Sequence, residues 1–130
     1  MTRVLVVNHD TALADEEVDS LRRRGYDVRE CLGPIGAHCP ILAGLACDLV
    51  DWADVVVYDA WATGEPEGAQ ALIEGLREHH PNVPIVLSAP GIEPGWIELS
   101  GTKQVTPLVG APVGQRLVTA IQAALDPTAA

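Results

Sequence analysis

Aromatic residues are scarce in this chain of 130 residues: they make up 4% of it, and phenylalanine is absent. The core must therefore be built from Val, Leu, Ile and Ala, and a protein that stacks bases or sugars on aromatic rings is disfavoured. Basic residues are also few, eight against eighteen acidic ones, which gives a formal net charge of −10. So acidic a chain repels phosphate backbones and anionic lipids, and we expect neither nucleic acid nor a membrane surface as a partner.

Long hydrophobic runs and targeting signals are also lacking. No apolar run approaches the roughly 18–20 residues that span a bilayer. Residues 1–3 lead directly into an apolar run, with no charged leader or cleavage site before it. We therefore expect a cytoplasmic protein. The three cysteines all fall between residues 31 and 47, a pattern that does not indicate a disulfide scaffold.

Sequence motifs of common enzymes are missing too. The chain has no Gly-x-x-x-x-Gly-Lys phosphate loop, no Gly-x-Gly-x-x-Gly after its first strand and no Gly-x-Ser-x-Gly elbow. We therefore expect a binding module without enzymatic activity. The length fits one domain, which we place at residues 1–125, followed by a flexible tail at 126–130.

Apolar runs and helical patterns alternate along the chain. The first three runs are continuous, which is typical of strands covered by helices on both faces. The predicted strands are 4–7, 27–31, 55–58, 85–87 and about 105–109, with 27–31 at an edge of the sheet. The predicted helices are 11–24, about 41–52, 66–80 and 112–125. Residues 91–102 are too broken by Pro and Gly for more than a short or irregular helix.

This order predicts an α/β fold with a single doubly wound, five-stranded parallel sheet. The expected strand order is the flavodoxin-like 2-1-3-4-5. In such sheets ligands bind outside the carboxyl ends of the strands. The polar residues there should form one shallow pocket. These residues are Asn8, His9 and Asp10 after the first strand, Asp59 and Trp61 after the third, Ser88 after the fourth and Ala111 after the fifth.

Four segments of the chain resemble the receiver domains of bacterial response regulators. They are Val4-Leu5-Val6-Val7-Asn8-His9-Asp10, Val55-Val56-Val57-Tyr58-Asp59, Ile85-Val86-Leu87-Ser88-Ala89 and Gly110-Ala111-Pro112. The resemblance extends over the whole chain in order, apart from an expanded stretch at 31–40. It implies that Asp59 occupies the position of the phosphoacceptor and Ser88 that of the hydroxyl that reports the phosphoryl group.

Two departures from the receiver pattern imply a degenerate phosphorylation site. The acidic pair that binds a divalent metal in receivers is here Asn8 and His9, with Asp10 one place further on, and Ala111 replaces the lysine before the proline. Phosphoryl transfer depends on cations that neutralise the phosphoryl oxygens. Since amide and imidazole serve magnesium poorly, we expect Asp10 and Asp59 to form only a weak Mg²⁺ site.

The same residues also have plainer interpretations. Asp59 could cap a turn, Ser88 could be an ordinary turn residue, and His9 could be a neutral, hydrogen-bonded loop residue. Trp61 could merely cover the pocket. His79 and His80 fall at a predicted helix C-terminus, where we expect them to act as a cap for the helix dipole.

The cysteine segment departs most from the receiver pattern. Cys31, Cys39 and Cys47 are spaced by eight, and His38 adjoins the middle one. Three thiolates and an imidazole would complete a tetrahedral zinc site, although no close Cys-x-x-Cys pair is present. A redox pair, Cys31 near Cys39, is a second interpretation, and packing as small buried hydrophobes is a third.

Three functions follow as hypotheses. The first is a stand-alone, receiver-like module of two-component phosphorelay signalling, a pseudo-receiver that binds a histidine kinase or a downstream effector independently of phosphorylation. Its surface, or that of a homodimer, would be the face of the fourth helix, fifth strand and last helix. The second is an active response regulator that is phosphorylated on Asp59. The third is a metal- or redox-sensing domain that uses Cys31, Cys39 and Cys47.

Overall fold

The computed structural model describes residues 2–8, 11–31, 40–41, 43–59, 66–88, 105–108 and 114–125. Its centre is a five-stranded sheet in the order β2-β1-β3-β4-β5, and all neighbouring strands pair in parallel. The strands are β1 (Arg3–Val7), β2 (Asp27–Cys31), β3 (Val55–Asp59), β4 (Ile85–Ser88) and β5 (Val105–Leu108). Both the predicted strand order and the edge position of β2 are confirmed.

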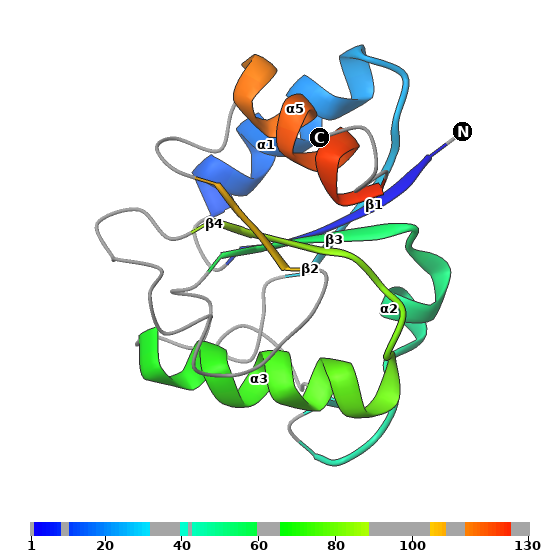
Figure 1. Ribbon diagram of the computed structural model, residues 1–130. Helices are drawn as coiled ribbons and strands as arrows, with labels where there is room; N and C mark the ends of the chain where they lie inside the picture. Colours follow the sequence, from blue (N-terminus) through cyan, green and yellow to red (C-terminus); the bar gives the residue numbers. More distant parts are fainter. Residues whose placement is uncertain are drawn as a thin grey trace.

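Helices lie on both sides of this sheet. They are α1 (Thr11–Arg23), α2 (Asp48–Trp52), α3 (Pro66–His79) and α5 (Gly114–Leu125). Figure 1 shows α1 and α5 over one face of the sheet, and α3 along the other with α2 near one end of it. Crossover helices on both faces cover a parallel sheet completely, as the continuous apolar runs predicted.

Successive strand residues point to opposite faces, so each strand supplies two cores. Val4, Val6 and Val57 pack with α1 and α5, whereas Leu5, Val56 and Tyr58 pack with α2 and α3. The side chains of these six residues are at most 1% exposed. The same alternation along three central strands explains why apolar residues stand side by side in the sequence.

The predicted helix at 41–52 is wrong over most of its length, because only Asp48–Trp52 is helical. Gly44 has a φ of 81°, in the left-handed region that glycine adopts readily, and the chain turns there. The turn contains backbone hydrogen bonds from the Leu45 amide to the Pro40 carbonyl and from the Gly44 amide to the Ile41 carbonyl. Leu45, which a helix would have placed near the core, is 60% exposed.

Several sequence predictions concern residues outside the described ranges. They are the irregular segment at 91–102, the start of the last helix at Pro112 and the tail at 126–130. Within the described part, α5 runs from Gly114. None of the helices in the described ranges has the length and apolar character that crossing a bilayer requires.

Candidate functional site at the carboxyl edge of the sheet

Three of the predicted site residues lie at the same edge of the sheet. Asp59 and Ser88 end β3 and β4 and are paired in register, and Asn8 directly follows β1. All three are buried, with 6%, 2% and 1% of their surface exposed. Because the sheet is parallel, the carboxyl ends of its strands meet here, and two side-chain oxygen groups from neighbouring strands are brought together.

A fourth residue, Glu17, joins this site from helix α1. Its side chain is 2% exposed, and its Oε1 accepts a hydrogen bond of 3.2 Å from the Asn8 Nδ2. Glu17 was not among the residues predicted for the site, although its position in the sequence carries a signal. Glu17 follows Ala14 by three residues and precedes Leu21 by four, so it lies on the apolar face of the helix.

Burial makes the Glu17 carboxyl a weak acid. Loss of solvation raises its pKa from 4.5 to about 7, the hydrogen bond from Asn8 opposes the rise, and the negative charges of Asp59 and Glu30 add to it. Glu17 therefore exchanges a proton near neutral pH. The neighbouring charges that raise its pKa are carboxylates, so the site has an acidic character.

The oxygens of Asp59, Glu17 and Asn8 are ligands of the hard type that magnesium prefers. However, within the described ranges no three His, Cys, Asp or Glu side chains form a group that could hold a metal ion. The predicted Mg²⁺ site paired Asp59 with Asp10, and Asp10 lies outside those ranges. The weak magnesium site therefore stays a prediction.

Several other predicted site residues also lie outside the described ranges. They are His9, Trp61 and Ala111 of the pocket, and His38 and Cys39 of the zinc or redox hypothesis. Of the cysteine set, the structure places Cys31 at the end of β2 and Cys47 directly before α2. The predicted helix at about 41–52 would have contained Cys47, but Cys47 has extended backbone angles and precedes the N-terminus of α2.

His80 has a different role from the predicted dipole cap. Its ring is buried, its Nε2 accepts a hydrogen bond of 3.0 Å from the Cys47 amide, and its Nδ1 lies 3.0 Å from the Asp51 Oδ1. A proton on Nδ1 satisfies both contacts, so the geometry selects this neutral tautomer. The imidazole thereby connects the end of α3 to both ends of the short α2 segment.

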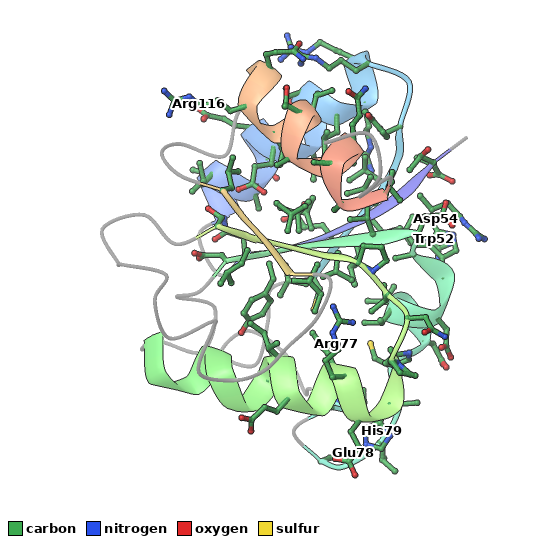
Figure 2. The ribbon with its side chains drawn as sticks, in the orientation of Figure 1. Trp52, Asp54, Arg77, Glu78, His79 and Arg116 are labelled. Atoms are coloured by element: carbon green, nitrogen blue, oxygen red, sulfur yellow. The ribbon has the colours of Figure 1, made fainter. Side chains whose placement is uncertain are left out.

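Arg77 reinforces the same connection from inside α3. Figure 2 shows its side chain directed toward the sheet, whereas Glu78 and His79 point away from it. The guanidinium donates hydrogen bonds to the carbonyl oxygens of His80 and Val83. The loop before β4 is thus anchored to α3, at the opposite edge of the sheet from Asp59.

Comparisons with known proteins bear on the fold. Neither a protein-family profile nor a curated protein matches the sequence. Solved structures do match. A response regulator receiver protein from Sinorhizobium medicae has 22% identity and a TM-score of 0.71, with 96% of this chain and 94% of that one covered. A response regulator receiver domain protein from Clostridium thermocellum has 15% identity and a TM-score of 0.75, with 99% and 98% covered.

The receiver domain of the Francisella response regulator 1452 is a third example, with 19% identity, a TM-score of 0.68, and 98% and 99% of the two chains covered. The chain has the receiver-domain fold. The receiver-domain fold places the carboxyl ends of β1, β3 and β4 together, and the acidic site described above is built there. At these low identities the likeness concerns the fold alone.

Proposed function

We propose that this chain is a receiver-like module of two-component signalling that acts by binding a protein partner, without efficient phosphorylation. The observation that carries the proposal is the contact between Asn8 and Glu17. The residue that follows β1 is a carboxamide, and its amide group donates to a buried carboxyl. In a receiver that binds a divalent metal, the resemblance implies a pair of acidic residues after β1 instead.

The chemistry of phosphoryl transfer supports this proposal. A carboxylate such as Asp59 accepts a phosphoryl group only when cations neutralise the transferred oxygens. Here Asn8 replaces one metal-binding acid and Ala111 replaces the lysine, and the only lysine in the chain is Lys103. Since Asp59 and the Glu17 carboxyl repel each other as like charges, further negative charge on a phosphorylated Asp59 would be electrostatically disfavoured.

The partner would be a histidine kinase or a downstream effector. The proposed docking face comprises the segment before β5, β5 itself and α5, and a homodimer through the same face is the variant of this proposal. Trp96, Ile97 and Leu99 supply apolar side chains in that segment of the sequence. Unchanged self-association and unchanged capture of a cognate kinase by Trp96→Ala would count against this face.

A second candidate function is that of an active phosphoacceptor. It is favoured by the register of β3 and β4, which sets Asp59 beside Ser88 at a buried edge. This is the arrangement that the resemblance implies for a phosphorylated aspartate and its reporting hydroxyl.

Intact-mass measurement after incubation with acetyl phosphate and Mg²⁺ separates the two functions. We expect no phosphoryl adduct on the wild-type chain. The double variant Asn8→Asp/Ala111→Lys restores the acid and the lysine, and we expect it to gain an adduct that a further Asp59→Asn change removes. An adduct on the wild-type chain that is absent from Asp59→Asn would overturn the proposal in favour of the active phosphoacceptor.

A further inference from the structure

Two cysteines that are distant in sequence face one small cavity between the sheet and its helices. Cys31 and Cys47 are both thiols, both are half-buried, and both pack against the core on the α2 and α3 side. They line the same cavity of about 40 Å³, together with Leu5, Val7 and Val50 among others. On this measure about 10–15 Å³ is enough to hold one water molecule, so the cavity has room for only a few small groups.

The path of the chain explains why the two thiols meet. Val7 pairs in register with Cys31, so the Cys31 side chain points to the same face as Val7, toward α2. Arg29, two residues earlier on β2, points to that face as well, and its guanidinium lies 4.5 Å from the centre of the Trp52 ring. Helix α2 therefore lies beside β2, which is the outermost strand on that side of the sheet.

Strand β2 and helix α2 carry the two cysteines near one another. Arg29 and Cys31 are two strand residues apart, about 6.6 Å, and Cys47 lies at the N-terminus of α2, the helix that ends at Trp52. Helix α2 runs toward the amino edge, because the Asp54 amide just after it donates to the Arg3 carbonyl at the start of β1. The contact of Arg29 with Trp52 thus sets α2 beside β2, and both Cys31 and Cys47 line the cavity between them and the core.

We propose that Cys31 and Cys47 form a reversible disulfide, with hydrogen peroxide as the oxidant. One thiolate attacks a peroxide oxygen and breaks the O–O bond, and with the uptake of one proton this leaves a sulfenic acid and water. The second thiol then attacks the sulfenic sulfur, which forms the S–S bond and releases a second water. A dithiol reductant returns both residues to thiols by exchange. The cavity between them gives the side chains room to approach within disulfide distance.

The disulfide would act on both edges of the sheet. The Cys31 carbonyl accepts a hydrogen bond of 3.1 Å from the Asn8 amide, so Cys31 adjoins the residue that contacts Glu17. The Cys47 amide donates to His80 at the other edge. The inference does not depend on the proposed signalling function, since it requires only the two thiols and the cavity.

The experiment is intact mass spectrometry of the full chain, reduced and then treated with a limiting amount of hydrogen peroxide. Trypsin cannot separate the three cysteines, because no Lys or Arg lies between Arg29 and Arg77. We therefore use three variants, Cys31→Ser, Cys39→Ser and Cys47→Ser, each of which keeps a different pair. Far-UV circular dichroism confirms that each variant is folded.

We expect the monomeric Cys39→Ser variant to lose two hydrogen atoms in mass, as the wild type does, and to regain them with dithiothreitol. The Cys31→Ser and Cys47→Ser monomers should lose none and should instead show sulfenic acid that dimedone traps. Loss of two hydrogens in Cys47→Ser but not in Cys39→Ser would assign the bridge to Cys31 and Cys39 and overturn the proposal. Absence of the bridge from every folded variant would overturn it too.

Discussion

The two faces of the sheet depart from uniform apolar packing in opposite ways. On the α1 and α5 face the described core is filled with aliphatic side chains, but Glu17 buries a carboxyl at its rim. On the α2 and α3 face no carboxyl is among the described core residues, but a cavity remains beside Cys31 and Cys47. A buried charge therefore lowers the stability of the fold on one face, and incomplete packing lowers it on the other.

The difference follows from what covers each face. Helices α1 and α5 have 13 and 12 residues and can present a continuous apolar stripe. Opposite them, the long α3 is accompanied by only a five-residue helix and the turn at Gly44. A turn offers single side chains such as Ile41 rather than a stripe, so it fills the space above the sheet less completely.

Glu17→Gln tests the electrostatic cost on the α1 and α5 face. Because the folded state raises the pKa of Glu17 from 4.5 to about 7, folding is progressively disfavoured as pH rises through that interval. The shift corresponds to about 3 kcal/mol of lost stability above neutral pH. The glutamine keeps the shape without the charge, so the variant should be more stable by roughly 2–3 kcal/mol at about pH 8 and little changed near pH 4.

Urea unfolding at the two pH values measures this effect, with Glu16→Gln as the matched control. Glu16 is the exposed neighbour on the same helix, and its replacement should change stability by less than about 0.5 kcal/mol. Parallel pH profiles for Glu17→Gln and the wild type would show that the Glu17 carboxyl carries no charge-dependent cost.

Gly75→Ala tests how tightly the turn packs on α3. Alanine stabilises an ordinary helix interior by about 1 kcal/mol relative to glycine. At Gly75, however, the added Cβ would lie 2.7 Å from the Ile41 Cγ2, and the β-branched side chain has little room to turn away. We expect a net loss of roughly 1–3 kcal/mol in the free energy of unfolding.

The Ile41→Ala background isolates that contact. There the clash is absent, and Gly75→Ala should regain its helix-propensity benefit, so a double-mutant cycle would show a coupling above about 1 kcal/mol. Additive effects of the two substitutions would mean that Ile41 does not restrict Gly75. Urea unfolding of the four proteins completes the cycle.

Much of this structure could be predicted from the sequence, because continuous apolar runs and the alternation of apolar with polar residues indicate which strand residues are buried. The continuous run at Val55–Tyr58 predicted a strand covered on both faces, and the edge strand at Asp27–Cys31 was predicted with the bounds it has. Position in a parallel sheet also brought Asn8, Asp59 and Ser88 to one edge. These predictions require only the order of the strands and the two-residue period of their side chains.

What could not be predicted depends on single side chains in three dimensions. Helical periodicity does not reveal that Gly44 adopts a positive φ and ends the pattern that begins at Ile41. It also does not reveal that Glu17, on the apolar face of α1, accepts a hydrogen bond from the Asn8 side-chain amide. The approach of Cys31 to the cavity beside Cys47 needs the register of β2 and the path of α2 together.

The smallest and sharpest comparison uses adjacent residues on β3. Val56 faces the cavity and Val57 the filled core, and each is 1% exposed. Changing either to isoleucine adds the same methylene and the same gain in transfer free energy, so any difference between them reports packing alone. Val57→Ile should cost about 1 kcal/mol or more through overpacking, whereas Val56→Ile should be neutral or stabilising by up to about 1 kcal/mol because the cavity accepts the group. Urea unfolding of the two variants measures both changes in the free energy of unfolding. Equal losses of stability would mean that neighbouring side chains already fill the cavity beside Cys31 and Cys47. A smaller loss for Val56→Ile would show that the α2 and α3 face retains space that a regular helix would have closed.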